Sequence, residues 1–188
     1  MNMTILTCGL HDPKAGLRST AEIHLPMLLD LFDRVLVTAS PETDTSFLAW
    51  LEKQGCVVYH RKDTSIVQSY VDAIKQGVKT HADTIFYCDA DRVLHWARAY
   101  PEELRRVAKK AHGVDYFVGM RGPREYQSHH DALYYTEQLP NAIISAAMGE
   151  TKPRDYLSGC YSFSLKAATY VAEHIKSKDL INESSMIS

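Results

Sequence analysis

The sequence predicts an α/β fold with a mainly parallel central sheet and helices on both faces. Short runs of β-branched and aromatic residues alternate with longer segments of helical period, which is the pattern of consecutive βα units. The chain has 188 residues, 45% of them hydrophobic and 23% charged, enough to bury one sizeable core. We therefore expect one domain over residues 1–188, and the small polar residues at its end are compatible with truncation at the C-terminus.

Six short runs are predicted to form the strands of the sheet. Their β-branched, aromatic and other apolar residues favour extended structure. In chain order they are Met3–Cys8, Arg34–Thr38, Cys56–Tyr59, Thr84–Cys88, Val114–Gly119 and Cys160–Ser164.

The segments between these runs carry helical patterns. The clearest is Ile66–Lys79, whose apolar side chains fall on one face and whose start Ser65 can cap. Residues 101–113 open on a proline and close on a glycine, as helices often do. A third segment, Asp131–Met148, contains Pro140, so we expect a kink or two short helices there.

Composition and cysteine spacing exclude several classes of protein. A net charge of -2 and a pI near 6.5 give no electrostatic reason to bind nucleic acid or an anionic membrane. The scattered cysteines lack the paired spacing of a zinc or redox motif, and we expect them to be buried and reduced. No apolar run approaches the roughly 20 residues needed to span a bilayer, and no basic segment precedes the apolar start of the chain. We expect a cytoplasmic protein without an integral membrane segment.

Two aspartates, Asp89 and Asp91, directly follow the apolar run Thr84–Cys88. In a parallel sheet the carboxyl ends of the strands open onto the ligand crevice. Because alternate residues of an extended chain share a face, we expect both carboxylates to reach one hard cation, directly or through water. Mg²⁺ or Mn²⁺ held in this way would keep coordination positions open for the phosphates of a nucleotide.

The same aspartates also have a purely structural interpretation. Asp89 would cap a turn and Asp91 would start the following helix, which are positions where aspartate is common. Against this stands the electrostatic cost of two like charges at the rim of a buried sheet, which a metal would remove. We therefore take Asp89 and Asp91 as candidate metal ligands.

The segment Ala82–Asp91, an apolar strand ending in Asp-x-Asp about halfway along a βα chain, resembles the nucleotide-sugar-dependent glycosyltransferases of the GT-A fold, family 2-like. The strand Thr4–Cys8 and the turn Ser158-Gly159-Cys160 resemble the same family. The resemblance implies transfer of a sugar from a nucleoside diphosphate sugar to an acceptor that the sequence does not identify. It also implies a divalent ion, Mn²⁺ or Mg²⁺, that bridges the diphosphate and neutralises the leaving group.

The resemblance also implies roles for individual residues. Asp91 would ligate the metal directly, and Asp89 would lie nearer the ribose or a metal-bound water. Thr7, in the first strand, would lie beneath the nucleotide. If the anomeric centre inverts, the catalytic base would be Glu183, after the late helical segment Lys166–Lys176; its structural interpretation is an exposed tail residue.

Further candidate substrate-binding residues lie in loops beside the predicted strands. Gly9 opens a loop with glycines and basic residues that suit phosphate contact, although the loop lacks the ending of a P-loop. Arg61, after the third strand, would clamp a diphosphate through its guanidinium. Arg121, after the fifth strand, would contact the sugar or the acceptor, and Ser158 and Gly159 form the turn into the last strand. The structural interpretation of the arginines and the glycine loop is solvated surface.

Many GT-A members carry an acidic residue at the end of the second strand to hold the base of the nucleotide. This chain departs from that pattern, because it reads Ala39-Ser40-Pro41-Glu42 there.

Two other functions fit the same residues. The segment Asp89-Ala90-Asp91 also resembles the first motif of haloacid-dehalogenase-type phosphatases, with Asp89 as nucleophile. Several strands precede that motif here, and no Asp-Asp pair follows to complete a magnesium site. The second alternative is a non-catalytic domain that binds a nucleotide sugar.

Overall fold

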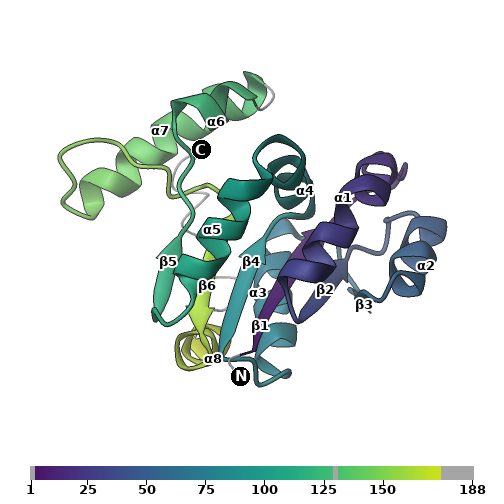
Figure 1. Cartoon of the computed structure of the whole chain (residues 1–188). Helices are drawn as coiled ribbons and strands as arrows, with labels where there is room; N and C mark the ends of the chain where they lie inside the picture. Colours follow the sequence, from purple (N-terminus) through teal and green to yellow (C-terminus); the bar gives the residue numbers. More distant parts are fainter. Residues whose placement is uncertain (1–2, 129–130, 175–188) are drawn as a thin grey trace.

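The computed structural model describes residues 3–128 and 131–174, which build one sheet with helices packed on it (Figure 1). The strands are β1 (Thr4–Leu10), β2 (Arg34–Ala39), β3 (Val57–His60), β4 (Thr84–Cys88), β5 (Tyr116–Val118) and β6 (Cys160–Ser164). They pair in the order β3-β2-β1-β4-β6-β5. The first four strands are parallel, whereas β6 runs antiparallel between β4 and β5. The predicted α/β fold with a mainly parallel sheet is confirmed.

Helices cover both faces of this sheet. In the described residues they are α1 (Arg18–Leu31), α2 (Thr45–Lys53), α3 (Ile66–Val78), α4 (Ala90–Ala99), α5 (Pro101–Ala111), α6 (Pro123–Ser128), α7 (Asp131–Ala147) and α8 (Leu165–His174). One face carries α1, α2, α4 and α5, and the other carries α3 and α8. The pair α6 and α7 lies beyond one edge of the sheet, apart from both layers (Figure 1).

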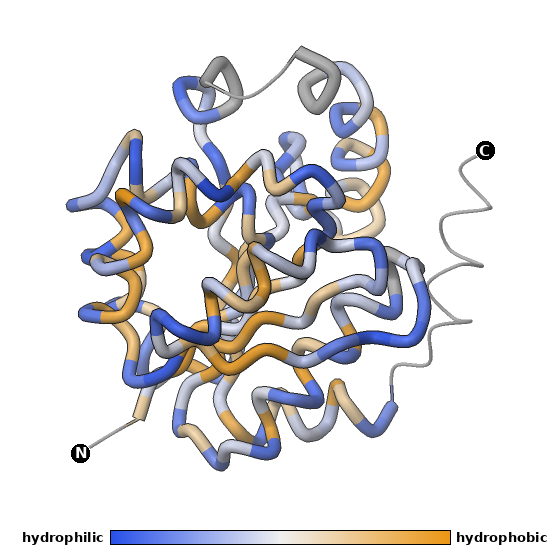
Figure 2. Tube along the Cα trace, turned by 90° about the vertical axis from the view of Figure 1, so that its right-hand side faces the viewer, coloured by the Kyte–Doolittle hydropathy of each residue, from blue (hydrophilic) through white to orange (hydrophobic). Residues whose placement is uncertain are grey.

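The alternation of side chains along the strands builds a core on each face. Ile5 and Ile85 pack toward α3 and α8, whereas their neighbours Leu6 and Phe86 pack toward α1 and α4. Strand β4 is buried along its whole length because it pairs on both sides and is covered on both faces. Figure 2 shows hydrophobic residues running along the central strands and hydrophilic residues concentrated on outer turns.

The predicted division of this segment into two short helices is wrong, because α7 is a single helix with Pro140 inside it. A kink at Pro140 stays a prediction. The turns on either side of the proline are anchored. Glu137 is bonded to Arg121, and Asn141 donates to Asp155 at 3.1 Å. The predicted helix start at residue 101 is confirmed, but a separate helix, α4, begins directly after β4. Within residues 3–128 and 131–174, no helix combines the length and the apolar character that crossing a bilayer requires.

The topology brings the loops of interest to one edge of the sheet. The carboxyl ends of parallel strands meet at the same edge, and the antiparallel strand β6 begins at that edge. Asp89 after β4, Arg121 after β5 and Gly159 before β6 therefore lie near one another despite their separation in the sequence.

Candidate functional site

The two aspartates occupy different local structures. Helix α4 begins at Ala90, so Asp89 is its N-cap and Asp91 lies in its first turn. The expectation that both carboxylates share one face of an extended chain is therefore wrong. Asp91 sits where an acidic side chain favours the helix dipole, but the Asp89 side chain makes no capping hydrogen bond. The purely structural interpretation thus explains the place of Asp91 and not the side chain of Asp89.

Asp89 is turned inward and is bonded to three side chains. Tyr87 donates its hydroxyl to Oδ1 at 2.5 Å, and Tyr70 donates to Oδ2 at 3.4 Å. Arg92 Nε lies 3.2 Å from the same Oδ2. Burial raises the pKa of Asp89, while the Tyr87 hydrogen bond and the Arg92 charge act in the opposite direction. The negative charge at the sheet rim is therefore balanced by a guanidinium.

Gly159, in the turn before β6, packs against Asp89. Its φ of +64° lies in the left-handed region, and a Cβ at this position would collide with Asp89 Oδ2. The backbone N–H of Asp89 donates to the Gly159 carbonyl at 3.1 Å. The turn predicted from the sequence thus touches the first aspartate, and glycine is required there for both conformation and space.

Asp91 faces a separate cavity of about 290 Å³. This side chain is exposed, and no hydrogen bond or ion pair to a described residue engages its carboxylate. The loop after β1 forms the opposite wall. Asp12 fixes that loop by accepting hydrogen bonds from the backbone N–H groups of Gly16 and Leu17, both at 2.8 Å. The cavity therefore pairs one available carboxylate with an ordered, glycine-containing loop.

The donor atoms at this cavity fit a divalent ion whose other ligands are substrate phosphates and water. In the described part of the chain no group of three His, Cys, Asp or Glu side chains is arranged to hold a metal. Of the two described carboxylates that line the cavity, Asp12 is bonded to Gly16 and Leu17, whereas the Asp91 oxygens are not engaged. Mg²⁺ is commonly held by one or two carboxylates, with substrate phosphates and water completing the shell. The residues present fit that manner of binding and do not fit a cage made by protein alone.

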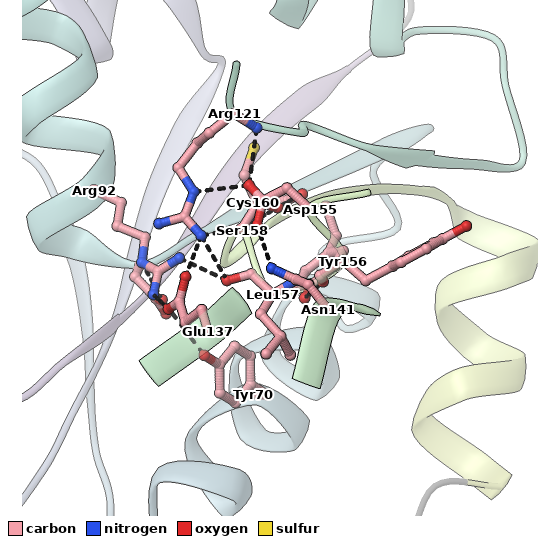
Figure 3. A network of polar contacts seen from close by, with 12 residues as sticks. Tyr70, Arg92, Arg121, Glu137, Asn141, Asp155, Tyr156, Leu157, Ser158 and Cys160 are labelled. Carbon is pink, nitrogen blue, oxygen red and sulfur yellow. Dashed lines mark hydrogen bonds and ion pairs between the residues drawn. The ribbon is translucent and has the colours of Figure 1, made fainter. Parts of the chain in front are cut away.

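Asp89 is the first member of a chain of alternating charges, and Figure 3 shows the members that follow it, from Arg92 to Asp155. Arg92 contacts Glu137 Oε1 through Nη2 at 3.1 Å, and the other oxygen of Glu137 accepts from Arg121. Arg121 Nε in turn donates to Asp155 Oδ2 at 2.8 Å. Glu137 comes from α7, so these ion pairs fasten that helix to the edge of the sheet. Their burial makes them strongly dependent on one another.

The structure gives packing contacts to several predicted substrate-binding residues. Thr7 is fully buried, and its hydroxyl donates to the Ala73 carbonyl at 3.0 Å. A Cβ on Gly9 would lie 2.6 Å from Ser69 Oγ, so this glycine lets α3 approach β1. These two contacts hold β1 against α3. The Thr7 side chain is closed to a ligand, whereas Gly9 also lines the cavity beside Asp91.

The remaining candidates are also bonded within the protein. Arg61 is buried and donates through Nη1 to the Ser65 carbonyl at 2.6 Å. The buried Ser158 hydroxyl bonds to the backbone of Cys160, and the Arg121 guanidinium is held by two acids. Glu183 lies outside the described residues.

Sequence reasoning missed the side chains that surround Asp89. Arg92 had a local signal, because a residue three positions on is a neighbour once the helix starts at Ala90. Tyr70 comes from a helix that was predicted, yet nothing in the sequence indicates which carboxylate it meets. Glu137 and Asp155 meet the arginines only through tertiary structure.

A larger groove lies beside Asp89, and its lining shares no residue with the Asp91 cavity. Its volume is about 900 Å³, within the range of small-molecule sites. Tyr70, Tyr87 and Arg92 line it and also contact Asp89. The groove is thus lined by the side chains that hold Asp89, whereas Ala90 and Asp91 line the smaller cavity.

No family model and no curated protein matches the chain. Solved structures do. Glucosyl-3-phosphoglycerate synthase from Mycobacterium tuberculosis, in complex with UDP, superposes with a TM-score of 0.54 at 16% identity over 88% of this chain and 57% of that one. The same enzyme with Mn²⁺, UDP-glucose and phosphoglyceric acid gives a TM-score of 0.51 at 15% identity, over 88% and 57% of the two chains.

A structure described as a mycobacterial protein gives a TM-score of 0.56 at 14% identity, covering 88% of this chain and 54% of its own. This chain thus spans somewhat more than half the length of the structures it matches. The chain has the GT-A fold of the nucleotide-sugar-dependent glycosyltransferases.

Proposed function

We propose that this protein is a metal-dependent glycosyltransferase that moves a sugar from a nucleoside diphosphate sugar to an acceptor hydroxyl. The observation that carries the proposal is the unengaged carboxylate of Asp91, which faces the ordered loop after β1 across a cavity at the crevice edge of the sheet. The matched synthase has been seen with UDP and with Mn²⁺, which supports a nucleoside diphosphate and a divalent ion as the ligands here.

The two aspartates have different roles in this proposal. Asp91 holds Mn²⁺ or Mg²⁺, and the ion, when bound, supplies positive charge against the diphosphate leaving group. Asp89 is a positioning residue, because both of its oxygens are already bonded to neighbouring side chains. It keeps the turn between β4 and α4 closed against Gly159, and so fixes where Asp91 points.

The transfer itself exchanges one bond for another. The bond between the anomeric carbon and the diphosphate oxygen breaks, and the acceptor hydroxyl oxygen bonds to that carbon. The acceptor proton must pass to a base. Glu183 stays the predicted base, and a cytoplasmic location likewise stays a prediction.

The proposal is tested by thermal unfolding with MnCl₂ and UDP, added singly and together. A ligand at one hundred times its Kd stabilises the native state by about 2.7 kcal/mol, which for a chain of this size raises Tm by about 5–10 °C. We expect this shift only with metal and UDP together. EDTA should abolish it, and Asp91→Asn should remove most of it.

Asp30→Asn is the matched control, because Asp30 is an exposed aspartate whose only described ion pair is with the surface residue Arg105. The Tm of this variant should rise with metal and UDP as much as that of the unmodified protein. An Asp91→Asn protein that is stabilised as strongly as the control would contradict the assignment of Asp91. Absence of any shift with UDP or GDP in the unmodified protein would contradict the donor class.

The two other functions give distinct results. The phosphatase hypothesis needs Asp89 as an attacking nucleophile, whereas both of its oxygens are bonded and Gly159 covers it. Hydrolysis of an aryl phosphate would nevertheless favour it. A non-catalytic binding domain would show the UDP shift without turnover of any nucleotide sugar.

A further inference from the structure

The groove beside Asp89 has an aromatic floor. Seven aromatic side chains line it, and six of them are tyrosines out of the eleven in the chain: Tyr70, Tyr87, Tyr116, Tyr156, Tyr161 and Tyr170, with Phe163. The sheet sets this arrangement. Tyr87 pairs with Tyr161 across β4 and β6, and Tyr116 pairs with Phe163 across β5 and β6. Cross-strand partners share a face, so four of the rings project from the same side of the sheet.

These rings form a continuous surface. The Tyr87 and Tyr161 centroids are 6.3 Å apart, and the Tyr116 and Tyr161 rings lie 6.4 Å apart with planes only 11° from parallel. Tyr70 extends the row at 5.0 Å from Tyr87. At the open side, Tyr116 and Tyr170 are 54% and 63% exposed. Large exposed aromatic side chains gathered in one hollow are characteristic of ligand sites.

The charges of the groove cancel. Asp115 and Glu137 oppose Arg92 and Lys166 in its lining, so two negative and two positive groups give no net formal charge. Arg92 is moreover bonded to both Asp89 and Glu137. A multiply charged anion such as phosphoglyceric acid, which one matched structure holds, would find no surplus of positive charge here. An uncharged ligand does not need a surplus of positive charge to bind.

We propose that this groove binds the acceptor and that the acceptor is a neutral glycoside, whose ring faces pack on the tyrosines. A sugar or aryl ring offers an apolar face to the phenol rings, and its hydroxyls suit the polar groups of the rim. Three residues of the groove lining, Tyr70, Tyr87 and Arg92, contact Asp89, which is the N-cap of the helix that carries Asp91. The acceptor role rests on the proposed function, whereas binding of a neutral glycoside does not.

The test is calorimetric titration of p-nitrophenyl β-D-glucoside into the full chain, with no metal and no nucleotide present. We expect saturable binding and no binding of phosphoglyceric acid. Tyr116→Ala and Tyr170→Ala each remove an exposed ring from the lining and should weaken binding by about five- to tenfold, in line with the strength of aromatic packing. Both side chains are more than half exposed, so the fold should survive.

Tyr135→Ala is the matched control, because Tyr135 is 76% exposed on α7 and is not part of the groove lining. It should bind the glucoside within about twofold of the unmodified protein, a margin well below the effect of a lost ring. The proposal is overturned if the glucoside does not bind, if the groove variants match the control, or if phosphoglyceric acid binds as well.

The two proposals fail separately. Loss of the UDP shift would remove the glycosyltransferase proposal and leave a tyrosine-dependent glycoside site in place. A UDP shift without glucoside binding would keep the donor proposal and remove this one.

Discussion

At the scale of single residues, Gly159 is the most constrained position of the site. Its positive φ and its contact with Asp89 both exclude a side chain. Gly159→Ala should lower the free energy of unfolding by about 3 kcal/mol or more, the sum of a left-handed conformation and an overpacked contact. Urea denaturation followed by circular dichroism measures this change.

Gly149 separates the two causes. Its φ of +75° is similar, but a Cβ there would meet nothing within 4 Å. Gly149→Ala should therefore cost only about 1 kcal/mol, the conformational part. Equal costs at the two positions would mean that the Asp89 carboxylate moves aside freely, and its positioning role would then be wrong.

The residue scale also shows where sequence reasoning stopped. The sequence was sufficient to place Asp89 and Asp91 at the carboxyl edge of the sheet, because the apolar run before them is unmistakably a central strand. It could not show that the helix starts at Ala90, and this one boundary turns the two carboxylates apart. Their partners, above all Tyr70 and Glu137, come from distant segments that only the fold brings near.

At the scale of the element, α7 is polar on the side that faces the protein. Glu137, Asn141 and Ser145 are buried at intervals of four residues, while Tyr135 and Leu139 are exposed. A periodic pattern identifies a helix. It shows which face of the helix is buried only on the assumption that the apolar face packs against the protein. Here the loop between α7 and β6 contacts the helix through charged and amide groups, so the assumption of an apolar buried face fails.

Breaking this polar interface should be costly. Arg121→Met removes the guanidinium that Glu137 and Asp155 share, and removal of one partner from a buried ion pair costs about 3–5 kcal/mol. Denaturant midpoints measure the loss. Arg18→Met removes an exposed i,i+4 pair with Glu22 and should cost no more than about 0.5 kcal/mol. Similar midpoints for the two variants would show that the buried pairs contribute no more than a surface pair.

At the scale of the whole molecule, the order of strands was only partly visible in the sequence. The alternation of runs and helical segments predicted the parallel strands, since each βα unit returns the chain to the same edge. The insertion of β6 between β4 and β5 depends on pairing across more than forty residues between β5 and β6 in the chain, and no local pattern encodes it. That insertion delivers Gly159 to Asp89 and Tyr161 to the groove.

The cysteines report on this whole assembly. Cys8, Cys56, Cys88 and Cys160 are free and buried, as predicted, and they come from segments far apart in the sequence. At pH 8 we expect no reaction of the native protein with a thiol reagent such as dithionitrobenzoate, and reaction of all four thiols in denaturant. Rapid reaction of one thiol under native conditions would show that its segment opens independently of the rest.

The same burial makes stability depend on alkaline pH. Desolvation raises the pKa of Cys56 to about 11, whereas an unfolded thiol ionises near pH 8.5. The native state therefore keeps a proton that the unfolded chain releases. The contribution of this group is fully present below about pH 8.5 and is lost as pH rises through 11, a loss of about 3 kcal/mol. The urea midpoint of unfolding should decrease from pH 8 to 9.5 and again to 10.5. The decrease should be smaller in Cys56→Ala. An identical pH profile in the variant would assign the whole effect to other groups.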